Sequence, residues 1–144
     1  MELALEQAAR AEARGEVPVG AVLVDAAGVV LAAAGNEVEA RHDPTAHAEL
    51  LVLRAAAALR QSPRLADCDL YVTLEPCAMC AAAISFARIR RLYYGAYDPK
   101  GGAVEHGARF FTLATCHHRP EIYGGIEEQR AAALLKDFFL SRRE

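Results

Sequence analysis

Two short motifs contain the side chains of this sequence that are best suited to hold a metal ion. His47 and Glu49 are separated by one residue, and Cys77 and Cys80, which directly follow Pro76, are separated by two. Each motif alone is a weak signal, because a Cys-x-x-Cys pair serves zinc binding, redox chemistry or neither. Together they supply an imidazole, two thiolates and a carboxylate, which are donors that zinc accepts in proteins.

The number of donors favours a catalytic zinc site over a structural one. A structural zinc normally has four protein ligands, whereas the three expected here, His47, Cys77 and Cys80, leave one position for water. Zinc lowers the pKa of bound water towards about 7, so that a neighbouring carboxylate can remove a proton and leave hydroxide. We therefore predict one Zn²⁺ per subunit, with Glu49 as the catalytic proton carrier. The alternative is a zinc that serves structure only, and the presence of Glu49 argues against it.

The spacing within each motif predicts where the site lies on its helices. Residues three apart share one face of a helix, so Cys77 and Cys80 can bind one ion in a first turn, where the helix dipole favours thiolates. His47 and Glu49 are two apart and point to nearly opposite sides of a regular helix. Both can reach one ion only beyond the tip of that helix. We therefore expect the site between the N-termini of two helices.

Helices and strands alternate in the part of the chain that carries the motifs. Good helix formers or helical spacing predict helices over residues 2–14, 46–60, 78–87 and 126–143. Apolar and β-branched runs predict strands over 17–24, 29–34, 70–74 and 89–95, the first two joined as a hairpin. Polar and glycine-rich segments predict loops over 35–45 and 98–107. The alternating order indicates an α/β fold with parallel neighbours in its sheet.

Composition limits the class of protein. The 144 residues are 53% hydrophobic and 24% charged, which is typical of a soluble globular chain and fits a single domain over 1–144. A net charge of −3 attracts no polyanion, so any nucleic-acid contact needs a local basic patch. The sequence has no recognisable signal peptide and no apolar run that could span a membrane, and its closest cysteine pair suits metal better than a disulfide. We expect a cytoplasmic protein that does not bind membranes.

Longer stretches around the motifs resemble bacterial tRNA adenosine deaminases. These stretches are residues 16–22, 35–36, 41–49 and 70–77, and the likeness covers nearly the whole chain. His-x-Glu followed by Pro-Cys-x-x-Cys is also the signature of zinc deaminases. The resemblance implies a cytidine-deaminase-like α/β/α fold with a central five-stranded mixed sheet, and a homodimer. It implies that zinc-bound hydroxide deaminates adenosine to inosine at the wobble position of a tRNA anticodon, with Glu49 as proton shuttle.

The resemblance also assigns substrate-binding roles by position. Asn36 would hydrogen-bond the purine, and Val19 and the backbone at Ala48 would complete the base pocket. Residues after the fourth strand and in the last helix would contact flipped anticodon nucleotides, namely Asp98, Lys100, Phe139, Arg142 and Arg143. Residue type alone allows plainer interpretations: a turn-forming Asn36, a core position for Phe138 or Phe139, and solvated arginines at the C-terminus.

Two rival functions fit the same motifs. A deaminase of a free base or nucleoside, such as guanine or cytosine, would share the zinc ligands, Glu49 and the fold. A non-catalytic zinc module that binds RNA or a protein would share the metal without needing Glu49. The extended match over 41–49 and the final helix favour a tRNA anticodon stem-loop as the partner.

Overall fold

The computed structural model describes residues 1–142, so the expectation for Arg143 lies outside the described residues. The elements are α1 (Glu2–Ala13), β1 (Gly20–Val24), β2 (Val30–Gly35), α2 (Val38–Arg41), α3 (Ala48–Arg60), β3 (Asp69–Leu74), α4 (Ala78–Ala87), β4 (Arg91–Ala96), the 3₁₀ turn η1 (Phe110–Thr112), β5 (Glu121–Tyr123) and α5 (Glu128–Arg142). The four long helices predicted from the sequence are therefore confirmed, with ends that shift by one or two residues.

The five strands form one mixed sheet in the order β2-β1-β3-β4-β5. Strand β1 runs antiparallel to both of its neighbours, β2 and β3. Strands β3, β4 and β5 run parallel to one another. The predicted hairpin and the predicted parallel neighbours are both present, but they belong to different halves of the sheet.

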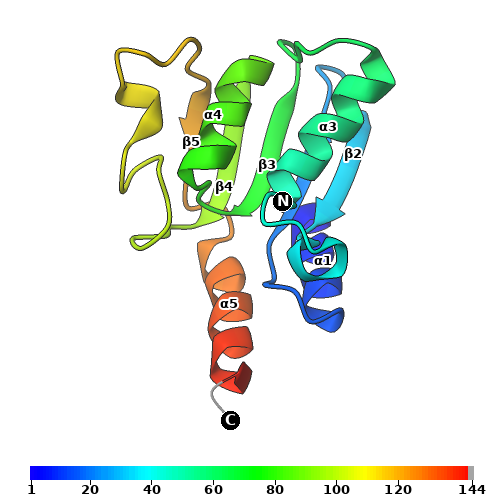
Figure 1. Cartoon of the computed structure of the whole chain (residues 1–144), viewed down its shortest axis with the longest axis vertical. Helices are drawn as coiled ribbons and strands as arrows, with labels where there is room; N and C mark the ends of the chain where they lie inside the picture. Colours follow the sequence, from blue (N-terminus) through cyan, green and yellow to red (C-terminus); the bar gives the residue numbers. More distant parts are fainter. Residues whose placement is uncertain (143–144) are drawn as a thin grey trace.

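Helices cover both faces of this sheet. Helices α3 and α4 lie side by side on one face, in front of the sheet in Figure 1, and α1 and α5 pack against the other. The main hydrophobic core lies between the sheet and the α3–α4 layer and includes the buried residues Leu70, Ile84 and Leu92. A smaller cluster of Leu5, Ala96 and Ala131 joins α1 and α5 to the sheet. The α/β/α layering is therefore confirmed.

Some boundaries differ from the predicted ones for local reasons. Strand β1 begins at Gly20 instead of 17, because Pro18 has no N–H to donate to a ladder. Helix α3 begins after His47, whose backbone is extended. Strand β5 has only three residues and gave no hydrophobic pattern of its own. None of the helices within residues 1–142 combines the length and apolar character needed to cross a bilayer.

Gly20 lets α1 lie directly on the β1–β2 hairpin. A Cβ atom at this position would overlap the carbonyl oxygen of Ala4 and lie 2.5 Å from the amide nitrogen of Ala8, both in α1. The strand therefore needs a residue without a side chain here. This contact fixes the end of the hairpin, from which Val19 and Asn36 reach the cavity described below.

Replacement of Gly20 by alanine should destabilise the fold by overpacking. We expect Gly20→Ala to lower the free energy of unfolding by about 1–3 kcal/mol, measured by urea denaturation. Gly101→Ala is a matched control, since its Cβ would come no closer than 3.1 Å to the side chain of Asp98. Equal stability of the Gly20→Ala variant and the parent would contradict the close packing of α1.

Candidate metal centre and active site

The two motifs lie at the first residues of α3 and α4. His47 is the N-cap of α3 with φ −73° and ψ 148°, and Cys77 is the N-cap of α4 with φ −73° and ψ 175°. N-cap side chains commonly accept hydrogen bonds from the first helical amides, but neither of these does so. Both side chains are therefore free to point beyond the helix ends.

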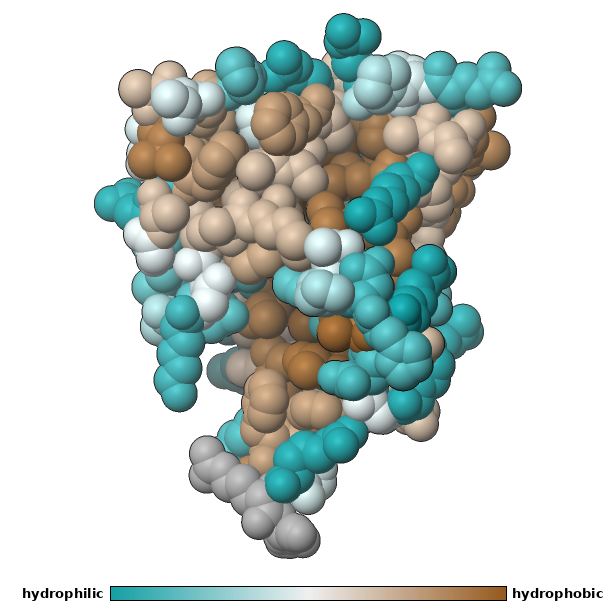
Figure 2. Space-filling model, viewed as in Figure 1, coloured by the Kyte–Doolittle hydropathy of each residue, from teal (hydrophilic) through white to brown (hydrophobic). Residues whose placement is uncertain are grey.

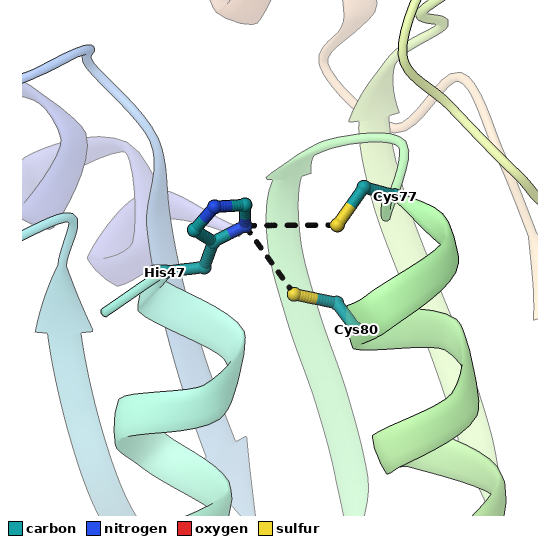
Figure 3. Close-up of side chains that lie close together, drawn as sticks. All are labelled: His47, Cys77 and Cys80. Atoms are coloured by element: carbon teal, nitrogen blue, oxygen red, sulfur yellow. Dashed lines mark hydrogen bonds between the residues drawn. The ribbon is translucent and has the colours of Figure 1, made fainter. Parts of the chain in front are cut away.

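His47, Cys77 and Cys80 converge on one point between the helix ends. Figure 3 shows the imidazole of His47 with its Nδ1 directed at both sulfur atoms. The Nδ1 atom lies 3.6 Å from Cys77 Sγ and 3.5 Å from Cys80 Sγ. One donor atom from each residue lies within 4.8 Å of the others. The expected position of the site beyond two helix N-termini matches this geometry.

The donor set fits zinc. One imidazole nitrogen and two cysteine sulfurs are borderline to soft donors, which suit zinc better than magnesium or calcium. Within residues 1–142, no further His, Cys, Asp or Glu joins this group, so the site offers three protein donors. A hydrogen bond from Cys80 lowers the pKa of Cys77 to about 4, which favours the thiolate form that zinc binds. The negative charge of a thiolate attracts a metal cation.

Glu49 lies beside this group in the first turn of α3. Its side chain is buried, with 4% of the residue exposed. Burial raises the pKa of Glu49 to about 7, and the negative charge of Cys77 acts in the same direction. A carboxyl group with this pKa can both accept and donate a proton near neutral pH. The environment of Glu49 therefore suits a proton carrier.

A cavity of about 870 Å³ opens onto His47, Glu49 and Cys77. Its walls come from the α1–β1 loop, the β2–α2 segment, the segment after β4 and the end of α5. Among the residues that line it are Glu16, Val19, Asn36, Glu75, Asp98, Gly101, Phe138, Phe139 and Arg142. Segments that are far apart in the sequence thus surround the metal-binding group.

Most residues predicted to bind substrate line this cavity. Val19, Asn36 and Asp98 belong to its wall, whereas Lys100 is exposed and outside the lining. The backbone N–H of Ala48 donates a 2.8 Å hydrogen bond to Asn36 Oδ1, so this backbone group already has a partner. The same bond fixes the side-chain amide of Asn36.

The end of α5 reaches across to the α1–β1 loop. Arg142 donates a hydrogen bond of 2.9 Å to the carbonyl oxygen of Gly15, and its guanidinium lies 4.6 Å from the centre of the Phe138 ring. Phe138 is buried, while Phe139 is half exposed. The core position therefore belongs to Phe138, although both rings line the cavity, and Phe139 is the more exposed of the two.

Two buried carboxylates in the wall were not among the predicted site residues. Glu16 accepts hydrogen bonds from the backbone N–H groups of Glu39 (3.1 Å) and Ala40 (2.9 Å) in α2. Glu75 is buried as well, and burial alone would raise its pKa, but hydrogen bonds from Asp98, His106 and nearby amides hold that pKa below its usual value. The only sequence signal for Glu75 is a charged residue between a buried strand and Pro76.

Comparison with known families and relatives agrees with this geometry. Residues 1–96 match the family model described as the cytidine and deoxycytidylate deaminase zinc-binding region. A tRNA-specific adenosine deaminase of Agrobacterium fabrum is 59% identical over 99% of this chain and 93% of its own length. The corresponding protein of Bacillus subtilis is 39% identical over 100% of this chain and 89% of its own length.

Solved structures give the same relationships. A structure from work on A-to-I editing by tRNA:A34 deaminases at the wobble position of transfer RNA has a TM-score of 0.92 and 60% identity, covering 94% of this chain and 97% of that one. The guanine deaminase of Bacillus subtilis has a TM-score of 0.65 and 30% identity, covering 99% of this chain and 91% of that one. The fold is therefore shared by deaminases of different bases.

Loss of one cysteine ligand should remove the metal. We expect the parent to bind about one zinc per chain and the Cys77→Ser and Cys80→Ser variants to retain little of it after dialysis, because two protein donors hold zinc weakly. Cys116→Ser is the matched control, since Cys116 lies beside Ser85 and His118, away from the site. Atomic absorption gives the zinc content. A zinc content in the Cys77→Ser variant equal to that of the parent would exclude Cys77 as a ligand.

Proposed function

The chain belongs to the cytidine and deoxycytidylate deaminase family, and on this premise we propose that it converts adenosine to inosine at the wobble position of a tRNA anticodon. The observation that carries the proposal is the buried carboxyl of Glu49 beside a three-donor group at the floor of an open cavity. A site of this kind supports hydrolysis, with water as nucleophile and ammonia as leaving group.

Different residues of the chain would bind the metal and transfer the protons in this reaction. His47, Cys77 and Cys80 would hold the zinc, which when bound acidifies water. Glu49 would take a proton from the attacking water and pass protons to the purine ring nitrogen and to the departing amine. Oxygen then replaces nitrogen on the ring carbon.

The base would be held by groups that the fold has already oriented. Asn36 Oδ1 accepts the N–H of Ala48, which leaves its Nδ2 donor for an acceptor on the purine. Val19 supplies an apolar surface on the same wall. We assign Asp98, Phe139 and Arg142 to the nucleotides next to the reacting base, because they line the same cavity and do not belong to the metal-binding group.

A second hollow supports RNA over a free base. It has a volume of about 510 Å³ and is lined by Arg14, Arg41 and Arg54, of which Arg41 pairs with Glu37. It shares the β2–α2 segment with the active-site cavity, since Gly35 and Glu37 line one and Asn36 lines the other. A chain with a net charge of −3 needs such a local basic region to bind a polyanion. The arginines are suited to phosphates of the anticodon stem-loop.

The surface over α4 supports a homodimer. Figure 2 shows mainly hydrophobic residues over α4 in the upper half of that view. Phe86 in α4 and Leu59 in α3 are each 65% exposed, which is unusual for large apolar side chains. We propose that a second copy covers this face, with the whole chain acting as one cytoplasmic deaminase domain. A solution mass of 15.5 kDa, the value for one chain, would contradict the dimer.

The substrate is tested by offering an anticodon stem-loop beside free adenosine, adenine, guanine and cytosine. We expect ammonia and inosine from the stem-loop and little turnover of the small molecules. Turnover of the small molecules alone would refute the tRNA proposal and favour the free-base deaminase.

The role of Glu49 is tested with the same assay. Glu49→Gln should lower kcat on the stem-loop by about 10²–10⁴-fold, because the variant cannot carry a proton, while zinc content and unfolding midpoint stay near those of the parent. A Glu49→Gln variant as active as the parent would refute Glu49 as the proton carrier. A parent without activity on any base would favour the non-catalytic zinc module.

A further inference from the structure

Glu75 makes an unusual number of hydrogen bonds for one side chain. It directly follows β3, and its carboxylate has no exposed surface. Oε1 accepts the N–H of Asp98 at 2.9 Å and lies 2.8 Å from His106 Nδ1. Oε2 accepts three backbone N–H groups, from Val104 (3.1 Å), Glu105 (2.9 Å) and His106 (3.1 Å). These five partner groups come from four residues within 98–106, the segment after β4.

The segment 98–106 forms one wall of the active-site cavity. Asp98 and Gly101 line the cavity, and Asp98 Oδ1 accepts the N–H groups of Lys100 (3.2 Å) and Gly101 (3.0 Å), which shapes the turn. Ala103 donates its N–H to the carbonyl oxygen of Pro76 at 2.8 Å. The segment thus lies against the residues that lead into Cys77, with Glu75 as its main anchor.

Gly102 is shaped to fit this anchor. A Cβ atom at Gly102 would lie 2.5 Å from Cδ of Glu75 and 2.6 Å from the carbonyl oxygen of Asp98. Real Cβ atoms do not approach other atoms so closely, so the segment can pack on the carboxylate only with glycine here. The Gly101–Gly102 pair therefore has a packing reason at its second position.

Glu75 is neither one of the metal-binding residues nor the proposed proton carrier. The carboxylate does not belong to the metal-binding group, and its five partners occupy both oxygens. A charge is costly to bury unless it is fully hydrogen-bonded, and here a single loop supplies every donor. Losing the carboxylate would therefore release the loop without removing a ligand or the proton carrier.

We propose that Glu75 is a positioning residue, which holds residues 98–106 in the conformation that contacts the RNA beside the reacting base. This inference rests on the proposed function, because the wall is useful for binding only if nucleotides flank the base. We therefore expect the loss of the Glu75 carboxylate to weaken the binding of substrate. Chemistry at the base stays with Glu49 and the metal-binding group.

Two variants test the contact between Glu75 and residues 98–106, one in Glu75 and one in the segment itself. Glu75→Gln keeps the size of the side chain but replaces one acceptor oxygen with a donor, and Gly102→Ala keeps the charge but forces the segment away. In both we expect KM for the stem-loop to rise at least about tenfold, the effect of losing a hydrogen bond to a charged group, with kcat changed less than about threefold. Zinc content should equal that of the parent. Glu121→Gln, which removes one charge from an exposed pair with Arg91, is the control and should leave KM unchanged.

Hydrogen–deuterium exchange tests the anchor without any activity. In Glu75→Gln, the amides of Val104, Glu105 and His106 should exchange at least about tenfold faster than in the parent, while amides of β3 stay protected. Unchanged exchange at these amides overturns the proposal, whether or not the protein proves to act on tRNA. Faster exchange with unchanged KM in an active enzyme also overturns it, as does a fall in kcat that follows loss of zinc. An inactive parent whose loop exchanges as expected would refute the proposed function alone.

Discussion

The close approach of two helix N-termini is the constraint on which the rest of this structure depends. Strands β2 and β3 both run antiparallel to β1, which lies between them, so they run in the same direction and end at the same edge of the sheet. Helices α3 and α4 follow these strands and begin at that edge. Two strand spacings amount to roughly 10 Å, close to the separation of packed helices. The sheet order therefore brings His47 and the Cys77–Cys80 turn within reach of one ion.

Buried carboxylates near this edge act differently because their surroundings differ. Glu49 has few donors around it, so burial raises its pKa to about 7 and makes it exchangeable. Glu75 is just as buried, yet its five hydrogen-bond partners stabilise the charged form and lower its pKa. The first environment suits proton transfer, and the second suits holding a loop. The number of donors, and not the residue type, separates the two roles.

Local features of this sequence could be interpreted without the structure, and long-range contacts could not. Helix formers and i, i+3 spacing predicted α4 and the shared face of Cys77 and Cys80, because both depend on neighbours in the chain. The choice of Nδ1 over Nε2 in His47 depends on the direction from which α4 approaches. The contact between Glu75 and residues 98–106 joins segments more than twenty residues apart and has no periodicity. Strand β5 was missed for a similar reason, since three residues show no pattern.

The proposed reaction requires a zinc ion with three protein donors, one imidazole and two thiolates, and a fourth position open to solvent. X-ray absorption at the zinc edge of the purified protein tests it most directly, because sulfur donors and histidine scattering are distinguishable. We expect two sulfur donors and two nitrogen or oxygen donors, with a single histidine. Three or four sulfur donors, or a second histidine, would mean that the position is filled by the protein and would contradict a hydrolytic site.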